Sequence, residues 1–125
     1  MRKGLIATIL WAALSLLFTV SCFLFLPPRG PIKFAPEALP AATSGVPYEV
    51  KITISGNATP AFLFSVSEGV LPKGLTLELV EEDHTARIFG TPQERGTFHF
   101  KVLVRCYGTN VPGQQGEQEY SLTVN

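Results

Sequence analysis

Regular alternation of apolar and polar residues, broken by glycine and proline, limits most strongly what this chain can fold into. Residues 48–55 read YEVKITIS, and residues 98–104 and 120–124 repeat the same every-second-position pattern. Side chains of an extended strand point alternately to its two faces, so this spacing is typical of strands that bury one face. Glycines such as those in Gly56-Asn57 and Lys73-Gly74 separate these segments. The chain therefore predicts an all-β protein with antiparallel sheets.

About seven strands in two layers are expected. Two sheets that press their apolar faces together form a β-sandwich with two polar outer faces. Six strands come from the alternating segments, and a seventh, interrupted by prolines, is expected within residues 32–42. Each buried aliphatic or aromatic side chain contributes roughly 1.5–3 kcal/mol of transfer free energy, so we expect the core to hold without a disulfide. The residues expected to face this core are Tyr48, Val50, Ile52, Ile54, Phe62, Phe64, Val66, Leu75, Leu77, Leu79, Ala86, Ile88, Phe98, Phe100, Val102, Val104, Tyr120, Leu122 and Val124.

The N-terminal part of the chain contains an uncharged apolar run at residues 5–26. As a helix rising about 1.5 Å per residue, this run reaches about 33 Å, enough to cross a hydrocarbon core of about 30 Å. Arg2 and Lys3 favour a cytoplasmic N-terminus, although Arg29 and Lys33 on the other side weaken that bias. We therefore expect a transmembrane helix that leaves the rest of the chain outside the cytoplasm, in the periplasm or at the cell surface.

Three fates of this run stay open. Its length favours retention as an anchor, because the apolar part of a cleavable signal usually spans only about 7–15 residues. Residues 19–22, TVSC, resemble a lipoprotein cleavage box in which Cys22 is the lipidation candidate. Ordinary signal cleavage after Ser21 would leave FLFL at a free N-terminus, which is a poor start for a soluble product.

Composition divides the chain into three parts. Residues 1–26 form the membrane anchor or signal segment, residues 27–37 a proline-rich linker, and residues 38–125 the sandwich domain. Proline fixes φ and has no backbone donor, so the linker is expected to be extended. At about 3.1 Å per residue it reaches on the order of 30 Å and holds the domain off the bilayer.

The sequence carries no signature of catalysis or of nucleic-acid binding. From residue 27 onward ten acidic residues stand against eight basic ones, so no basic surface is expected to hold nucleic acid. His84 and His99 fall on different elements, and the chain has no HExxH, CxxC or GxSxG motif. Trp11, the sole tryptophan, belongs to the apolar run, which disfavours a carbohydrate-binding platform. We expect a protein that is not an enzyme, with Cys106 as a small buried residue.

Several short stretches with fixed spacing resemble a known family. They are LPKGLTL at residues 71–77, IFGTP at 88–92 and GTFHFKVLV at 96–104, preceded by Leu39-Pro40, Gly45 and Pro47-Tyr48. Over residues 39–124 the chain thereby resembles the immunoglobulin-like modules, of the cadherin-like sandwich type, found in bacterial surface and extracellular proteins. The resemblance implies an immunoglobulin-like sandwich that works in adhesion, surface display or spacing, without chemistry of its own.

The resemblance also implies calcium in some members. Where members often carry an acidic residue after the longest strand, this chain has Cys106, which disfavours a calcium site. Glu81, Glu82 and Asp83 form a weak candidate, but Ca²⁺ takes six to eight oxygen ligands. A solvated acidic turn is the favoured interpretation, and no cofactor is expected.

Loops at the two ends of the sandwich are the expected binding elements. Residues 43–47, 67–71 and 91–96 are expected at the end far from the apolar run, and residues 81–85 and 108–118 at the near end. The candidate binding residues are Thr43, Ser44, Glu68, Gln93, Glu94, Arg95, Asn110, Gln114 and Gln115. We expect a protein partner of unknown identity, met from outside at the far end and within the same membrane at the near end.

An alternative function belongs to another class. The small residues Ala12, Ala13 and Ser15 give the apolar run a face on which a second transmembrane helix can pack closely. The chain would then be a structural accessory subunit, assembled into a membrane complex through its anchor helix.

Overall fold

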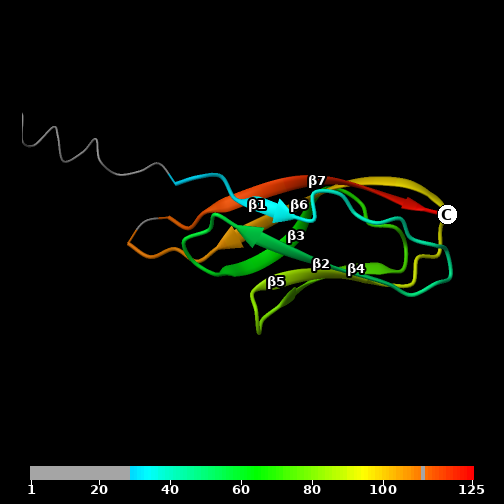
Figure 1. Cartoon of the computed structure of the whole chain (residues 1–125), viewed down its shortest axis with the longest axis horizontal. Helices are drawn as coiled ribbons and strands as arrows, with labels where there is room; N and C mark the ends of the chain where they lie inside the picture. Colours follow the sequence, from blue (N-terminus) through cyan, green and yellow to red (C-terminus); the bar gives the residue numbers. More distant parts are fainter. Residues whose placement is uncertain (1–28, 111) are drawn as a thin grey trace, which may run out of the picture.

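Seven strands in two sheets build the part of the chain that the structure describes. The computed structural model describes residues 29–110 and 112–125. Its strands are β1 (Lys33–Ala35), β2 (Tyr48–Ser55), β3 (Ala61–Gly69), β4 (Leu75–Val80), β5 (Thr85–Gly90), β6 (Gly96–Cys106) and β7 (Gln115–Val124). One sheet has the order β1-β2-β5-β4 and the other β3-β6-β7, with antiparallel pairing throughout both (Figure 1). This order is that of a constant-type immunoglobulin sandwich, so the predicted all-β sandwich is confirmed.

The register of the four-stranded sheet aligns the apolar faces of its strands. Val50 on β2 lies opposite Ile88 on β5, and Leu77 on β4 lies opposite Ile88 from the other side. In the same way Ile52 pairs with Ala86. Ile52, Ala86 and Ile88 are fully buried. Alternate residues of the neighbouring strands therefore form one continuous inner surface, as the period of two predicts.

The long strand β6 lies at the centre of the three-stranded sheet, between β3 and β7. Phe100 pairs with Tyr120 on β7, and their ring centroids are 6.1 Å apart. Val102 and Val104 on β6 have no exposed surface. The buried apolar residues of both sheets form one core, made of Phe34, Ala42, Ile52, Ala61, Phe64, Leu75, Ala86, Ile88, Phe100, Val102, Val104, Cys106, Tyr120, Leu122 and Val124.

Strand β3 departs from the predicted alternation. Phe62, expected to face the core, is 40% exposed, whereas Ala61 is fully buried and Phe64 is 6% exposed. The pairing of β3 with β6 has an irregularity between Ala61 and Leu63. An additional residue at a bulge moves the following side chains to the opposite face. The prediction for Phe62 was therefore wrong.

The first strand lies inside the segment that the sequence assigned to the linker. Residues 33–35 pair with β2, and Phe34 is 5% exposed within the core. The chain then crosses to the other sheet, where Ala42 forms a parallel bridge with Val124. The packed structure thus begins before residue 38, because this segment contributes an apolar side chain that the core covers.

The loops of the sandwich gather at two poles. The near pole comprises residues 29–31, 56–60, 81–84 and, apart from residue 111, 107–114. The far pole comprises residues 43–47, 70–74 and 91–95 with Asn125. In Figure 1 the C-terminus lies at the far pole, on the right, and the blue start of the described chain lies toward the opposite end.

The predicted membrane segment, its lipidation candidate Cys22 and the cleavage position after Ser21 lie outside the described residues. Within residues 29–110 and 112–125, the structure has no helix with the length and apolar character needed to cross a membrane.

Candidate functional site

The residues that carry the family resemblance build a rigid joint at the far pole. Gly74, at φ 97°, and Gly90, at φ 131°, lie where β4 begins and β5 ends. A Cβ on Gly74 would stand 2.0 Å from the Thr91 carbonyl oxygen, and a Cβ on Gly90 would stand 2.0 Å from the Gly74 carbonyl oxygen. Pro72 and Pro92 are fully buried beside them. These positions therefore hold two backbone segments together, and their role is structural.

Backbone hydrogen bonds tie the loops of the far pole to one another. The Gly45 amide donates to the Pro92 carbonyl at 2.8 Å, and the Gln93 amide donates to the Lys73 carbonyl at 2.9 Å. The Ser44 amide donates to the carbonyl of Asn125 at 2.8 Å, which adds the C-terminus. The far pole is thus a platform of joined loops rather than a set of separate ones.

Most of the predicted far-end binding residues stand on this platform. Thr43, Gln93, Glu94 and Arg95 are exposed, and Ser44 is partly buried. The loops of the far pole also expose two apolar side chains that the sequence analysis did not single out. Val46 is 51% exposed and Val70 is 70% exposed. Each follows a glycine with positive φ, Gly45 or Gly69. An apolar residue next to a turn glycine was the signal that could have identified them.

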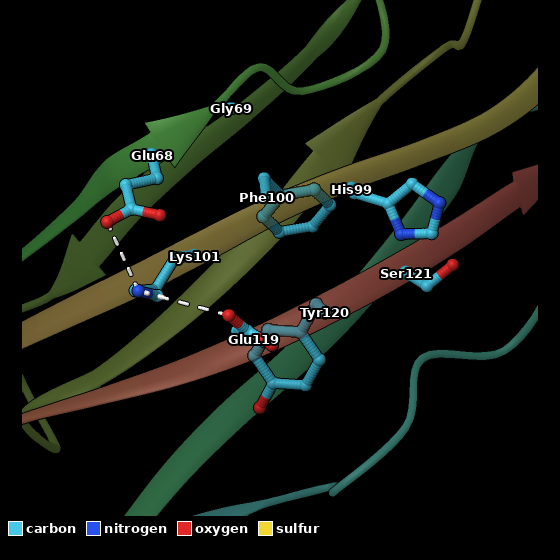
Figure 2. Close-up of a pocket in the computed structure, with 8 residues that line it drawn as sticks. All are labelled: Glu68, Gly69, His99, Phe100, Lys101, Glu119, Tyr120 and Ser121. Atoms are coloured by element: carbon cyan, nitrogen blue, oxygen red, sulfur yellow. Dashed lines mark ion pairs between the residues drawn. The ribbon is translucent and has the colours of Figure 1, made fainter.

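A charged groove of about 310 Å³ lies on the outer face of the β3-β6-β7 sheet (Figure 2). The Lys101 ammonium on β6 lies 3.2 Å from Glu68 on β3, 3.8 Å from Glu117 and 3.9 Å from Glu119, both on β7. The hydrogen bond to Glu68 raises the pKa of Lys101, and the charges of the three glutamates act in the same direction. The predicted residue Glu68 is therefore engaged in an ion pair.

The same groove places His99 beside Ser121, since these residues pair across β6 and β7. Both side chains are exposed on the outer face, as Figure 2 shows. The core-facing prediction for Phe98, Phe100 and Val102 implies an outward direction for the residues between them, but it does not identify their partners on β7. The strand register sets those partners, and the alternation alone does not fix that register.

The near pole contains the remaining predicted binding residues. Asn110 and Gln115 are exposed. The Gln114 side chain accepts a hydrogen bond from the Ala58 amide at 2.8 Å and donates to the Gly56 carbonyl at 3.3 Å. Gln114 thus joins the 107–114 loop to the 56–60 loop.

The acidic turn between β4 and β5 is stabilised by local contacts. Asp83 forms an ion pair with Lys51, and its carboxylate accepts a hydrogen bond from the Thr85 hydroxyl at 2.5 Å. The hydrogen bond from Lys51, followed by that from Thr85, lowers the pKa of Asp83 to about 2. Glu81 and Glu82 are exposed on the same turn. Among the described residues, no three His, Cys, Asp or Glu side chains are placed to hold a metal ion together.

The remaining chemically reactive groups take part in packing. His84 has a φ of 55°, and its Nδ1 donates to the Ala61 carbonyl at 3.0 Å, which links the β4-β5 turn to the other sheet. Cys106 is a free cysteine with 3% exposure, as the sequence predicted, and burial raises the pKa of its thiol.

Comparisons with known proteins identify the family. The chain is similar in fold to the ASH / PapD-like domain of human CEP192 (PapD-like domain 7), with 14% identity, a TM-score of 0.45, and coverage of 80% of this chain and 89% of that one. A search of curated proteins finds no match. The profile of the He_PIG family, described as "Putative Ig domain", matches residues 30–125. The chain therefore belongs to this immunoglobulin-like family.

Proposed function

We propose that this chain is a membrane-anchored, non-enzymatic immunoglobulin-like module that binds a protein partner, mediates adhesion or acts as a spacer at the cell envelope. The proposal rests on the difference between the two ends of the sandwich. The uncharged apolar run at residues 5–26 precedes the near pole by only a few residues, while the joined loops of the far pole lie at the opposite end. An anchor at one end and a platform at the other suit display outside the cytoplasm.

The composition of the far pole supports binding of another protein. Val46 and Val70 supply exposed apolar surface, and Gln93, Glu94 and Arg95 supply polar groups near it in the same set of loops. Protein interfaces combine an apolar centre with a polar rim. Because backbone hydrogen bonds already join these loops, a partner would lose little free energy in ordering them.

The state of the titratable groups agrees with a role without catalysis. His84, Lys101 and Asp83 are each engaged by neighbouring groups of the same chain. A general base needs a free position within hydrogen-bond reach of a substrate proton. His99 is exposed in the groove, where the carboxylates of Glu68 and Glu119 pair with Lys101.

Partner capture from detergent-solubilised membranes tests the far pole directly. The tagged full-length chain is compared with a Val70→Ser, Arg95→Glu double variant and with Glu82→Lys, which reverses an exposed charge at the near pole. We expect the double variant to lose a partner that the wild type and Glu82→Lys both retain. Equal capture by all three chains would show that the far pole is not the binding surface.

The anchor has two separate tests. The intact mass of the mature chain distinguishes a retained anchor from cleavage after Ser21 and from lipid attachment at Cys22. Replacement of residues 5–26 with an unrelated transmembrane helix then separates the two functions. A module that binds through its sandwich keeps its partner, whereas a subunit assembled through Ala12, Ala13 and Ser15 loses it.

A further inference from the structure

Two aromatic side chains are left exposed at the near pole. Phe62 on β3 is 40% exposed and Tyr107, after β6, is 52% exposed. Their ring centroids are 5.0 Å apart with the planes tilted by 40°. The Tyr107 amide donates to the Pro60 carbonyl at 3.0 Å, and the Thr59 hydroxyl donates to the Tyr107 carbonyl at 2.6 Å. The backbone therefore holds both rings at the surface.

A cationic side chain accompanies the two rings. Arg105 is exposed and lines, with Phe62, a hollow of about 320 Å³. Its other walls come from Cys106, Gly108, Gly113, Gln114 and Gln115. No carboxylate is among the residues that line this hollow. The acidic residues Glu81, Glu82 and Asp83 lie on the β4-β5 turn, which belongs to the other sheet and which the His84–Ala61 hydrogen bond joins to the start of β3. The hollow beside Phe62 thus combines an aromatic ring with one positive charge, that of Arg105.

The chain length between this surface and the apolar run is short. The Arg29 guanidinium donates to the Pro112 carbonyl at 3.4 Å, which fastens the start of the described chain to the 107–114 loop. Three residue steps separate residue 26 from Arg29, and an extended chain covers about 10 Å in that number of steps. The polar headgroup layer is itself several ångströms thick. An anchor that ends at residue 26 therefore brings the near pole to the headgroups.

We propose that Phe62, Tyr107 and Arg105 form a lipid-facing patch that seats the sandwich in the headgroup layer of an anionic membrane. Aromatic rings with one polar end favour the membrane–water interface. A guanidinium suits lipid phosphates because it donates several hydrogen bonds in one plane. Since the patch lies on the β3-β6-β7 layer, the domain tilts toward that layer and directs its far pole outward. The inference rests on the membrane anchoring proposed above.

Depth-dependent fluorescence quenching of the full-length chain tests the patch. The chain is reconstituted into vesicles of phosphatidylcholine and phosphatidylglycerol whose acyl chains are brominated either near the headgroup or midway along. In a Trp11→Phe background, tryptophan is placed in turn at Phe62→Trp and Tyr107→Trp. We expect both to lose most of their emission with the bromine near the headgroup and to lose less with the deeper bromine.

Matched variants give the controls. Val70→Trp, at the far pole, is expected to keep its emission in both kinds of vesicle. Arg105→Glu combined with Tyr107→Trp is expected to reduce the quenching, since it replaces the cation with an anion. Circular dichroism verifies that each variant keeps its β spectrum, and the two reporter positions guard against a local defect at either one.

The native Trp11 separates failure of this inference from failure of the anchor. If Trp11 of the unaltered chain is quenched while Trp at 62 and 107 is not, the patch does not face lipid although the anchor stands. If Trp11 is not quenched in either vesicle, the membrane anchoring itself is wrong. A blue-shifted emission at 62 and 107 without bromine quenching would show that a protein, such as a second copy of the chain, covers the patch, and would overturn the assignment to lipid.

Discussion

At the scale of single residues, Gly74 and Gly90 carry backbone conformations that other residues rarely adopt. Their φ values are 97° and 131°, and neighbouring carbonyl oxygens occupy the space that a Cβ would need. Such positions tolerate glycine alone without strain. The most recognisable letters of the sequence therefore report how the strands are joined and not what the protein binds.

Substitution of these glycines tests that role. Gly74→Ala and Gly90→Ala are each expected to lower the free energy of unfolding by about 2–4 kcal/mol, because the strain of positive φ adds to a clash with backbone atoms. Gly30→Ala is the control, since nothing lies within 4 Å of its Cβ position. Urea unfolding of the full chain in detergent micelles measures all three. A Gly74→Ala variant as stable as Gly30→Ala would contradict the close contact.

Ionisation of Tyr120 makes the stability of the fold depend on pH in the alkaline range. Its hydroxyl donates to the Pro36 carbonyl at 2.8 Å, and burial raises its pKa from 10.0 to about 12. The folded chain thus keeps the phenol proton at a pH where the unfolded chain loses it. Stability is fully present below pH 10 and is lost as the pH rises toward 12, by roughly 2–3 kcal/mol.

Urea unfolding across this pH range measures the effect. We expect Tyr120→Phe to lose less unfolding free energy than the wild type as the pH rises. At neutral pH the variant is expected to be about 1 kcal/mol less stable, because the Pro36 carbonyl loses its donor. Tyr107→Phe, with its side chain about half exposed, serves as the control. An identical alkaline loss in Tyr120→Phe and the wild type would show that the buried phenol is not responsible.

At the scale of elements, strand β3 determines which residues reach the core and which reach the surface. Its two phenylalanines stand two positions apart in the sequence, yet Phe64 is 6% exposed and Phe62 is 40% exposed. The bulge between Ala61 and Leu63 separates their environments. The same irregularity turns Phe62 toward Tyr107 and so produces the aromatic surface of the near pole.

Alanine substitution of the two phenylalanines distinguishes a bulged strand from a regular one. Phe64→Ala is expected to cost about 3–5 kcal/mol of unfolding free energy, since it leaves a cavity in the core. Phe62→Ala is expected to cost about 1 kcal/mol or less, as an exposed position whose chief contact is one aromatic pair. If both variants lost similar unfolding free energy in the same urea titration, β3 would alternate regularly and the bulge would be rejected.

The sequence was sufficient for most elements because one physical signal dominates them. Period-two alternation identified β2, β6 and β7 through residues such as Ile52, Val102 and Leu122, all of which are fully buried. Alternation does not report hydrogen-bond register, so the prediction failed at Phe62. There a bulge between Ala61 and Leu63, which no glycine marks in the sequence, changes the face on which the side chain lies. The sequence indicated an early strand within residues 32–42 but not its bounds, because Phe34 is the single buried side chain of a three-residue strand.

Fewer contacts of the candidate site could be predicted from the sequence, because these contacts also depend on strand register. Lys101 and Glu119 are neighbours only because of the β6-β7 register, and a connection of eight residues leaves that register free in the sequence. The loops of the far pole were located in the sequence, but their mutual hydrogen bonds, such as that from Gly45 to Pro92, depend on the folded backbone.

At the scale of the whole molecule, the sandwich has two unlike ends. The near pole joins residue 29 to the 107–114 loop and carries the exposed rings of Phe62 and Tyr107. The far pole joins three loops and the C-terminus through backbone hydrogen bonds and exposes Val46 and Val70. A single core connects them, so an anchor at one end fixes the direction in which the other end points.

The most direct test of this account is the side of the membrane on which the far pole lies. An Arg95→Cys variant carries a new thiol in an exposed loop. It is treated with a membrane-impermeant maleimide in spheroplasts, whose inner membrane is intact, and in parallel after lysis. The wild-type chain gives the background, in which the buried thiol of Cys106 is expected to stay unlabelled. We expect equal labelling of Arg95→Cys before and after lysis if the far pole lies outside the cytoplasm, and labelling only after lysis would place it inside.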